Sequence, residues 1–523
     1  MPQLKSPPFA FDALILLLVS IAVVAFSMVQ GAYDFDPHHW GLMLSNASDF
    51  AEGRIPYKDI FIQYGFLTTA IESWFYSIAH NIQSLIFGVS LLYAFGLIGI
   101  YFLALQLSSC RKIALFSLVV AFLIHPLAIY PWPNYVSFPF IVFGCWMIVK
   151  DRGRLGFLGG TLLACAVLAR ETLFAPLAIV ILASLPIYLW FSPVSPSKIS
   201  LMAPLLGFLV PLAAFGGYLW YADLFEYWRL TAIELPKLYA HIFFKDGLPS
   251  AITALLKYIF YLSFSEHIRQ TIFALILLSA TTVWITALAR KTRSPNLVFV
   301  ALLSGVLFSS ALHINEIFRL ATSATVGLCL VFIIADRLHV ATPLFVALSI
   351  GLVVGGFGDS SGNYFMPKKE QIASSTKDNR IALFKGQRWS REIFDYYNWF
   401  THDMRILQSR PCTLRYFRNE TRDAFLAILS PYSQYQLAPF GAGMGGVPID
   451  DWSRRLRPDY DLPTRLLARD IIIISSQRAD AVADRAIPNG YRIFDRRVTP
   501  KSRFLPDGDM TLIVAPEACG PLT

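Results

Sequence analysis

The feature that most constrains this chain is the recurrence of long apolar runs over its first 357 residues. Runs of roughly 18–22 apolar residues are long enough to cross a hydrocarbon core of about 30 Å. Because lipid-facing backbone must satisfy its own hydrogen bonds, such runs predict helices. Charged residues make up only 15% of the chain, against about 25% in soluble proteins. The sequence therefore predicts an α-helical polytopic membrane protein.

The connections between the apolar runs are of two kinds, one rich in Lys and Arg and the other in histidines, aromatics and acids. The two kinds alternate if residues 66–79, which are apolar but short and contain Glu72, form a surface helix. The same argument makes residues 250–264 a surface or re-entrant piece. We then expect about 11 spans, the first one uncleaved, with every basic connection on the cytoplasmic side. The expected spans are residues 9–30, 84–107, 113–131, 133–149, 155–170, 173–191, 202–221, 269–289, 296–313, 319–335 and 338–356.

A polar stretch, residues 31–65, follows the first span. Asp36-Pro37 is typical of a helix start, with Asp as the N-cap and Pro in the first turn, and Gly53 is typical of a helix end. We expect an amphipathic helix over residues 37–52, lying at the membrane interface. The stretch is either a solvated loop or an active site at the membrane surface. Its ionisable residues are Asp34, Asp36, His38, His39, Asp49, Arg54, Lys58 and Asp59.

The expected topology places several other ionisable groups on the same outer face as this stretch. They are the Arg170-Glu171 pair and the segment from His313 to Arg319. Ionisable groups near lipid are costly and tend to be functional. A purely structural role remains open for each of them. Arg170 and Glu171 would form an internal ion pair that steadies the bundle, and Arg319 would anchor the end of a span to lipid headgroups.

The composition changes near residue 358, after which charges recur every few residues. Residues 471–475, 491–495 and 510–515 have strand patterns, and residues 394–407 and 420–429 have helical patterns. We expect residues 358–523 to form a soluble α/β or α+β domain on the extracytoplasmic side, following a transmembrane domain over residues 1–357. Cys412 and Cys519 form a disulfide if this tail faces an oxidising compartment; two free thiols are the alternative.

Three short motifs between spans 1 and 2 resemble the first outer loop, here residues 31–83, of the GT-C superfamily. They are Asp34-Phe-Asp36-Pro-His38-His39, Gly53-Arg-Ile-Pro56-Tyr57-Lys-Asp59 and Gln63-Tyr64-Gly65. GT-C proteins are membrane glycosyltransferases that use polyprenyl-phosphate sugars, and the similarity is to the protein mannosyltransferase and aminoarabinose transferase types. The resemblance covers roughly residues 9–355, and the tail is not diagnostic.

The resemblance implies an inverting transfer in which a carboxylate of the first outer loop deprotonates the acceptor hydroxyl. Asp36 matches the catalytic position best, and Asp34 is the competitor. The chain lacks the adjacent Asp-Glu pair of some members. Three points therefore stay open. Either aspartate is the base, Asp36 has only a capping role, or a divalent cation (Mg²⁺ or Mn²⁺) takes part.

A phosphate leaving group needs positive donors where its charge develops. The expected partners are a polyprenyl-phosphate-sugar donor, a glycan, lipid or protein acceptor, and the bilayer itself. The net charge of +9 has no basic tail of the nucleic-acid-binding type, so we expect no nucleic acid. We expect location in a bacterial inner (plasma) membrane, with an extracytoplasmic active site. The expected substrate-binding residues are His38, His39, Lys58, Asp59, Tyr64, Arg170, Glu171 and Arg319.

Two other functions stay open. A transporter or flippase would place ionisable groups near the bilayer midplane and show related halves, and neither feature is seen here. A lipid-linked polysaccharide polymerase or ligase would carry basic residues in a large late outer loop. Residues 223–268 form a candidate loop of this kind, with Arg229, Lys237, Lys245 and Lys257.

Overall fold

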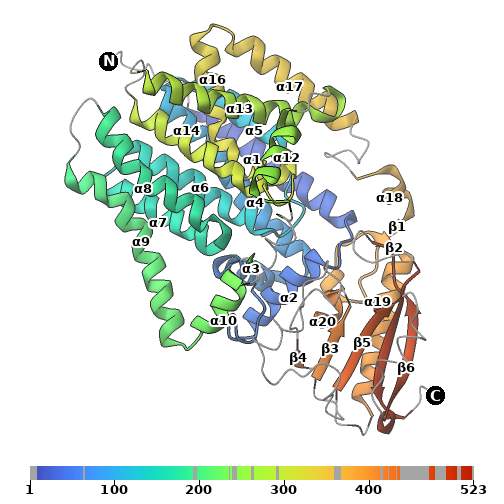
Figure 1. Ribbon diagram of the computed structural model, residues 1–523. Helices are drawn as coiled ribbons and strands as arrows, with labels where there is room; N and C mark the ends of the chain where they lie inside the picture. Colours follow the sequence, from blue (N-terminus) through green and yellow to red (C-terminus); the bar gives the residue numbers. More distant parts are fainter. Residues whose placement is uncertain are drawn as a thin grey trace.

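The helices dominate the computed structural model, and a small sheet follows them at the C-terminal end of the chain (Figure 1). The structure describes residues 9–62, 65–192, 197–234, 236–237, 244, 246–260, 264–289, 294–358, 367–410, 412, 416–421, 423–431, 433–435, 470–476, 490–502 and 508–520.

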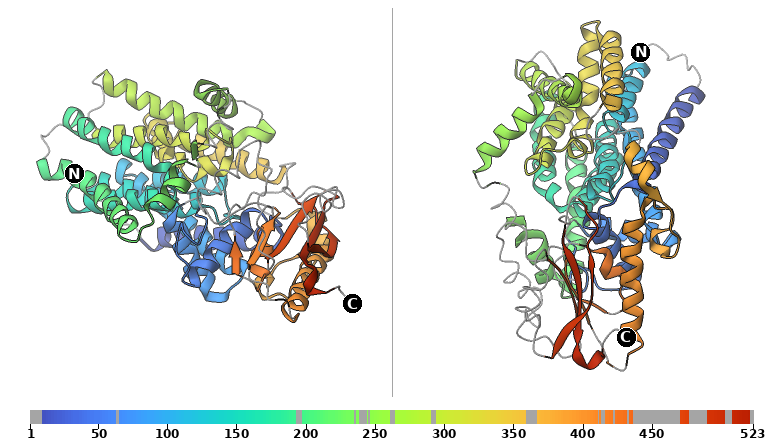
Figure 2. Two further views of the ribbon diagram at one scale, coloured as in Figure 1. Left: turned by 60° about the horizontal axis from the view of Figure 1, so that its bottom comes forward. Right: turned by 90° about the vertical axis from the view of Figure 1, so that its right-hand side faces the viewer.

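The apolar part of the chain forms a helical bundle (Figures 1 and 2). Its α-helices are α1 (Phe9–Tyr33), α2 (His39–Ala51), α3 (Phe66–Ala79), α4 (Ile82–Ser108), α5 (Arg111–Ile124), α6 (Pro133–Lys150), α7 (Arg154–Ala169), α8 (Phe174–Phe191), α9 (Lys198–Tyr221), α10 (Phe225–Arg229), α12 (Leu248–Phe260), α13 (Phe264–Leu288), α14 (Pro295–Leu307), α15 (Ile317–Ala321), α16 (Leu328–Arg337) and α17 (Ala341–Gly358). Shorter turns are η1 (Glu171–Leu173), η2 (Leu230–Glu234), η3 (Phe308–Ala311) and η4 (Ala324–Gly327).

Each expected span contains a helix, which confirms the predicted helical class. Five of the described helices are long and apolar enough to cross a membrane: Ala10–Tyr33, Ile82–Ser108, Glu171–Phe191, Ser200–Tyr221 and Ile268–Leu288. Four shorter apolar helices accompany them: Arg154–Ala169, Leu248–Phe260, Pro295–Ala311 and Ala341–Phe357. With 14 residues, α3 is shorter than the roughly 20 residues that a span needs.

Two expected spans have different bounds in the structure. The helix expected over residues 113–131 ends at Ile124, because His125 precedes Pro126 and a residue before proline disfavours the helical conformation. The helix expected over residues 319–335 is interrupted between α15 and η4. There the Ser323 hydroxyl donates to the carbonyl of Arg319 at 2.6 Å, a local bond that competes with regular helix geometry.

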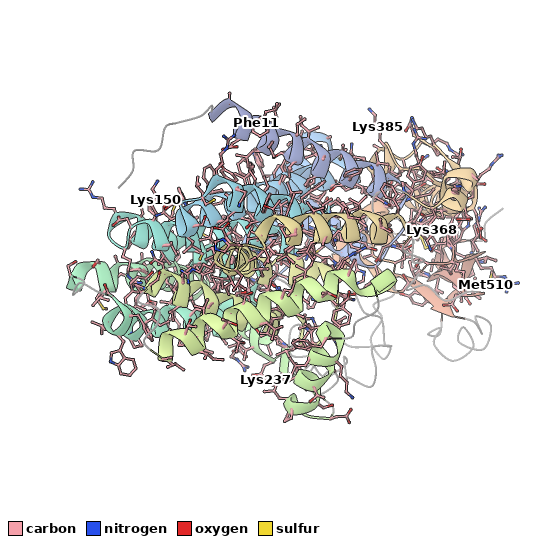
Figure 3. The ribbon with its side chains drawn as sticks, turned by 90° about the horizontal axis from the view of Figure 1, so that it is seen from above. Phe11, Lys150, Lys237, Lys368, Lys385 and Met510 are labelled. Atoms are coloured by element: carbon pink, nitrogen blue, oxygen red, sulfur yellow. A yellow bond between two sulfur atoms is a disulfide. The ribbon has the colours of Figure 1, made fainter. Side chains whose placement is uncertain are left out.

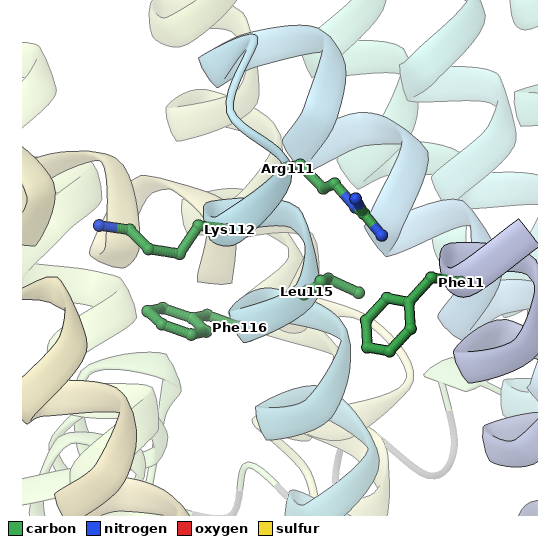
Figure 4. A pocket seen from close by; sticks show the side chains of 5 residues that line it. All are labelled: Phe11, Arg111, Lys112, Leu115 and Phe116. Atoms are coloured by element: carbon green, nitrogen blue, oxygen red, sulfur yellow. The ribbon is translucent and has the colours of Figure 1, made fainter. Parts of the chain in front are cut away.

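The basic connections gather at one end of the bundle. Arg111, at the start of α5, donates to Asp12 of α1 at 2.6 Å, and Lys112 pairs with Asp336 of α16 at 3.2 Å. The close view of this end shows Arg111 pointing toward Phe11, and Lys112 pointing to the other side, next to Phe116 (Figure 4). The start of α1, the start of α5 and the end of α16 therefore lie at the same end of the bundle, as predicted for these basic connections.

The polar tail lies beyond the other end of the bundle. Phe11 and Lys150 lie toward one end of the molecule, whereas Lys368, Lys385 and Met510 lie at the other (Figure 3). The segments that begin or end near the tail are the C-terminus of α1, helices α2 and α3, and the start of α4 (Figure 1). This end therefore carries the polar stretch that the sequence singles out.

The tail contains a mixed five-stranded sheet with helices beside it. Its strand order is β4-β3-β5-β7-β6, with β3 parallel to β4 and β5 and with β7 antiparallel to β5 and β6. The strands are β1 (Ser375–Thr376), β2 (Trp389–Ser390), β3 (Tyr416–Glu420), β4 (Ser433–Tyr435), β5 (Asp470–Ser476), β6 (Tyr491–Val498) and β7 (Met510–Pro516). The helical elements are α18 (Lys369–Ser374), η5 (Ala382–Phe384), α19 (Arg391–Gln408), α20 (Phe425–Leu429) and η6 (Glu517–Cys519).

The three expected tail strands and the helix expected over residues 394–407 are confirmed by β5, β6, β7 and α19. The helix expected over residues 420–429 is shorter, because β3 continues to Glu420 and α20 begins only at Phe425. Of the two alternatives for the tail cysteines, the structure has the disulfide between Cys412 and Cys519.

Tail and first loop share one hydrophobic core. Side chains of α2, α3 and α4, among them Trp40 and Phe75, pack in one cluster with Phe384, Trp389 and Phe425 of the tail. Every residue of α2 from Trp40 to Asp49 is buried. The helix expected over residues 37–52 is thus present, but protein covers it on both sides, which its amphipathic pattern did not predict.

Candidate active site

Asp36 is fixed at the start of the turn that leads into α2. Its Oδ1 accepts hydrogen bonds from the backbone N–H groups of His38 (3.2 Å) and His39 (3.0 Å). The Trp40 N–H donates to the Asp36 carbonyl oxygen at 3.1 Å. The carboxylate therefore satisfies amides of the turn that precedes α2, but α2 itself begins at His39 with His38 at its N-cap position, two residues later than the sequence predicts.

The second oxygen of Asp36 contacts an imidazole. Its Oδ2 lies 2.6 Å from Nδ1 of His39, and the Asp36 residue is only 3% exposed. A carboxylate offers about four lone-pair positions, so these contacts leave acceptor capacity on Asp36. The His39 ring lies 4.8 Å from the Trp132 ring and 4.8 Å from the buried His38 ring.

Asp34 is held by two tryptophans, one in the first loop and one in the tail. Its Oδ2 accepts from Nε1 of Trp40 at 3.0 Å, and its carbonyl oxygen accepts from Nε1 of Trp389 at 2.7 Å. Trp389 belongs to the tail, and the backbone N–H of Ala424 donates to the Pro37 carbonyl at 3.1 Å. The tail therefore fixes the backbone on both sides of Asp36.

The Gly53–Asp59 motif forms a turn that reaches the end of α7. The Asp59 carboxylate accepts from the Ile55 N–H at 3.0 Å, which holds the turn itself. Lys58 is exposed. The Tyr57 hydroxyl donates to Oε1 of Glu171 at 2.7 Å, and the Trp228 indole donates to the same oxygen at 3.1 Å.

Gly65 lets the first loop approach α7 closely. Its φ of +130° is disfavoured for other residues, and a Cβ there would lie 2.6 Å from the carbonyl oxygens of Leu168 and Ala169. One turn later, the Thr68 hydroxyl donates to the Ala169 carbonyl at 2.7 Å. These contacts bring the first loop against the end of α7, directly before Arg170. Tyr64, the other residue proposed from this motif, lies outside the described residues.

Arg170 and Glu171 make contacts in different directions. The Arg170 guanidinium, which is 6% exposed, donates to the Ser310 carbonyl at 3.2 Å, while Glu171 accepts from Tyr57 and Trp228. The pair therefore ties the first loop and α10 to the turn after α14.

Arg170, Arg269 and Arg319 each act electrostatically on a histidine of this region, and we call these three residues the arginine cluster. Arg170 and Arg319 both act electrostatically on His313. Arg269 acts on His125, whose Nε2 lies 2.7 Å from the Tyr135 hydroxyl.

The cluster is electrostatically consistent with binding an anion. Burial, together with the charges of Arg319 and Arg170, lowers the pKa of His313 to about 3, so this imidazole is neutral at neutral pH. Arg319 also donates to Glu316 at 2.8 Å, which balances part of its charge. Guanidinium groups are well suited to phosphate oxygens.

Aromatic residues connect Asp36 with the arginine cluster. Trp132, beside His39, immediately precedes α6, and the Tyr135 N–H donates to its carbonyl at 3.0 Å. The Tyr135 ring stacks on Phe318, with centroids 6.0 Å apart, and Phe318 is the neighbour of Arg319. The aspartate–histidine pair and the cluster therefore flank the first turn of α6.

Metal ligation was also tested against the geometry. Among the described residues, no group of three or more His, Cys, Asp or Glu side chains is arranged to hold a metal ion. The Asp36–His39 contact supplies only two such side chains. The described residues thus show no metal site, the divalent cation that the sequence left open stays open, and no step below is routed through one.

Sequence reasoning missed three residues of this region. Tyr57 was visible within the Gly53–Asp59 motif, but its partner Glu171 is 114 positions away. Arg269 stands at the start of an expected span, and only its place on the outer side could have singled it out. Trp389 carried no signal, because its contact with Asp34 joins residues 355 positions apart.

Comparisons with known proteins bear on the fold. No protein-family profile and no curated protein sequence matches the chain. Solved structures do match, and two of them are described here. The oligosaccharyltransferase of Archaeoglobus fulgidus, solved in complex with Zn and sulfate, is similar over 90% of this chain and 69% of its own, at 13% identity and a TM-score of 0.51. ArnT from Cupriavidus metallidurans, in the apo state, is similar over 98% of this chain and 100% of its own, at 12% identity and a TM-score of 0.56.

Both of these proteins are GT-C membrane glycosyltransferases. The chain has the GT-C fold. The match to ArnT spans the tail as well as the bundle, so the GT-C likeness extends beyond residues 9–355, where the sequence motifs placed it. At these identities the GT-C likeness concerns architecture, and the chemistry must be argued from the residues of this chain.

Proposed function

We propose that this chain is an inverting glycosyltransferase that moves a sugar from a polyprenyl-phosphate donor to a glycan, lipid or protein acceptor on the extracytoplasmic side. The observation that carries the proposal is the placement of a buried, fixed carboxylate and a cluster of arginines at one end of a GT-C bundle. A transfer of this kind needs a base on one side of the anomeric carbon and an anion site on the other.

Asp36 is the proposed general base. It takes the proton of the acceptor hydroxyl, the hydroxyl oxygen forms a bond to the anomeric carbon, and the bond from that carbon to the phosphate oxygen breaks. The electron pair of the broken bond leaves with the phosphate. His39, 2.6 Å from Asp36, holds the carboxylate in place and is available to share the proton.

Asp34 is the weaker candidate. Its carboxylate accepts the Trp40 indole and its backbone accepts the Trp389 indole, so its visible contacts join the first loop to the tail. Asp36, by contrast, contacts a half-buried imidazole that borders the aromatic path to the arginine cluster.

Arg170, Arg319 and Arg269 are proposed to bind the donor phosphate and to stabilise the negative charge that develops on it. The turn motif contributes indirectly: Tyr57 holds Glu171 and thereby the backbone next to Arg170. Lys58, which is exposed, and His38 remain proposed contacts for substrate oxygens, whereas Asp59 is proposed to act through the turn.

The extracytoplasmic orientation is supported by two features. Arg111 lies over the ring of Phe11, which is at the opposite end of the molecule from the tail residues Lys368 and Met510 (Figure 3), as expected if this basic connection is cytoplasmic. The tail carries a disulfide between Cys412 and Cys519, which is typical of an oxidising compartment such as the bacterial periplasm.

The polymerase or ligase alternative is less well supported. Two of its four basic residues pair with acids of the same loop, because Arg229 bonds Glu226 and Glu234, and Lys237 bonds Glu234 at 3.2 Å. Those two cations are therefore engaged locally, whereas Lys257 is exposed. Lys245 lies outside the described residues.

The donor class is tested with the purified protein in nanodiscs. Undecaprenyl phosphates carrying one labelled sugar (mannose, glucose, galactose or aminoarabinose) are supplied with a cell-envelope extract as acceptor, and mass spectrometry follows free undecaprenyl phosphate and labelled product. We expect one donor to yield both in equal amounts. Arg170→Gln and Arg319→Gln should each lower kcat/KM by roughly tenfold or more, as loss of a charge-assisted phosphate contact predicts.

The alternatives give different outcomes in the same system. Counterflow of labelled sugar lipid across proteoliposomes without covalent product would establish a transporter. Turnover of a preassembled lipid-linked oligosaccharide but of no single-sugar donor would establish a polymerase or ligase. Either result would overturn the proposal.

A further inference from the structure

A second polar pocket lies on the tail, between α19 and the edge strand β6. It has a volume of about 650 Å³, and its lining includes Trp399, His402, Arg405, Arg497 and Arg380. Arg497 stands on β6, which has a neighbour on one side only, because β6 ends the strand order of the sheet. The pocket thus occupies a groove between a helix face and an open sheet edge.

The charged lining residues lie outside the core of the tail, whereas Trp399 packs against its hydrophobic cluster. On α19, Phe394, Tyr397, Phe400 and Met404 are buried in the shared hydrophobic cluster. Trp399, His402 and Arg405 recur at spacings of three residues on another face of the helix, as neighbours on a helix surface do. Both His402 and Arg405 are exposed. Nothing in the packing therefore explains why this face is cationic.

Positive charge exceeds negative charge in the pocket lining, which holds three arginines and one acidic residue, Asp395; Arg497 also acts electrostatically on Asp403. Arg380 pairs with Asp378 and with Asp395. Arg405 and Arg497, by contrast, have no acidic side chain within ion-pair distance in the part of the chain that is described. Two guanidinium groups in one pocket can bind the oxygens of a carboxylate or phosphate with paired hydrogen bonds.

An immobilised aromatic ring adjoins these charges. The Trp399 indole donates to Oδ2 of Asp495 at 2.7 Å, and its ring lies 5.7 Å from that of Tyr396. The ring is therefore held by its polar edge while its apolar surface lines the pocket. A fixed apolar ring beside hydrogen-bonding cations suits a ligand with both apolar faces and charged groups, as sugar acids and sugar phosphates have.

We infer that this groove binds the anionic part of a glycan, through Arg405, Arg497 and Trp399. The volume is that of a small-molecule site. The bound groups would be carboxylates or phosphates on an oligosaccharide, since both present the same oxygen chemistry to arginine.

The groove is connected to the first loop by α19 itself. The helix begins at Arg391, two residues after Trp389, which bonds the backbone of Asp34. With a rise of about 1.5 Å per residue, Trp399 to Arg405 lie roughly 12–21 Å along the helix from its start. An extended oligosaccharide could therefore occupy both places. That the occupant is the acceptor rests on the proposed glycosyltransferase function, whereas the binding itself does not.

The binding is measured by isothermal titration calorimetry on the full-length protein in nanodiscs. The probes are trigalacturonate (carboxylates), trehalose 6-phosphate (phosphate), neutral maltotriose and inorganic phosphate. We expect the two anionic sugars to bind more weakly as salt rises and maltotriose to bind at least tenfold more weakly. Arg405→Ala and Arg497→Ala should each weaken the anionic sugars about tenfold or more. Trp399→Phe, which keeps a ring, should weaken them less than these changes do.

The controls separate this inference from the proposed function. Lys369→Ala removes an exposed cation of the tail that is outside the pocket lining, and Asp36→Asn changes the first loop; neither should alter binding. Equal affinity for maltotriose, or for inorganic phosphate alone, would overturn the inference. So would an equal loss in Lys369→Ala, or selective binding to phosphatidylglycerol vesicles instead of the anionic sugars. Binding by a protein that fails to transfer sugar would overturn only the proposed function.

Discussion

Asp36 can cap a helix and act as a base because a carboxylate accepts several hydrogen bonds at once. Two backbone amides take Oδ1, and His39 contacts Oδ2. The capping bonds fix the position of the group, which a general base requires, since proton transfer depends on hydrogen-bond reach. The two roles that the sequence left as alternatives are therefore compatible in one side chain.

Asp49, on the buried side of α2, should make stability depend on pH. Burial raises its pKa to about 7, although Arg54, 3.4 Å away, opposes the shift. In the unfolded chain the pKa is about 3.9. The folded state therefore holds a proton that the unfolded state has lost, so the stabilisation is complete below about pH 4 and is lost as pH rises through 7.

Asp49→Asn should remove this dependence. Between pH 4.5 and 8, the free energy of unfolding of the wild type in detergent should fall by on the order of 1–4 kcal/mol relative to that of the variant. Chemical unfolding at a series of pH values measures the difference. Parallel pH curves for the two proteins would contradict the assignment.

At the level of single residues, the sequence predicts local roles and misses remote ones. Asp36 precedes Pro37 and the His38–His39 pair, so its capping position follows from neighbours in the chain. The contact of Tyr57 with Glu171 and that of Trp389 with Asp34 join residues 114 and 355 positions apart. No local pattern encodes such contacts, because they depend on how the helices pack.

Among the elements, α2 decides how the tail meets the bundle. Its Gly41 lies against the backbone of α20, where a Cβ would lie 2.7 Å from the Phe425 nitrogen and 2.8 Å from the Ala424 carbonyl carbon. Backbone atoms cannot rotate away as a side chain can. The close approach of the two helices therefore requires glycine.

Gly41→Ala should loosen the tail. Overpacking at such a contact typically costs about 1–3 kcal/mol, and we expect faster hydrogen exchange in α20 and a lower melting temperature. Gly216→Ala is the matched control, since a Cβ there meets nothing within 4 Å and alanine favours the helix. Equal behaviour of the two variants would mean that α20 is not held by this contact.

Elements were predicted best where one strong pattern decides them. Apolar length identified the helices of the bundle, and short runs rich in β-branched and other apolar residues identified β5, β6 and β7. The burial of α2 was missed because a polar helix surface that packs on another polar surface looks the same as one that faces solvent. The early end of α5 was missed because apolar residues such as Leu127 and Ala128 continue beyond it, although Pro126 was visible.

For the whole molecule, we propose that the arginine cluster, the first loop and the tail lie outside the cytoplasm. Cysteine labelling tests this orientation. In a background with Cys110 and Cys165 replaced by serine, Lys58→Cys in the exposed turn should react with a membrane-impermeant maleimide in intact cells. Lys150→Cys, exposed at the other end of α6, should react only after permeabilisation. The reverse pattern would place the proposed site in the cytoplasm.

The sequence predicted the fold of the whole molecule, but it did not predict that the first loop and the tail pack against each other. Span lengths and basic connections were sufficient for a GT-C-like bundle with a polar tail. The division at residues 357 and 358 stays a prediction, and the hydrophobic cluster that joins Trp40 to Trp389 and Phe425 crosses it. Such a cluster forms from residues that each look like ordinary core positions in the sequence.

The central claim is that Asp36 removes the proton from the acceptor. Asp36→Asn is the decisive variant, because asparagine caps helices about as well as aspartate but is no base. The assay is release of undecaprenyl phosphate in nanodiscs, with the donor identified as above. In Asp36→Asn the release should fall by roughly 100-fold or more, while the melting temperature stays unchanged. Asp34→Asn and the remote control Asp151→Asn should keep far more activity. Wild-type release by a folded Asp36→Asn protein would contradict the account.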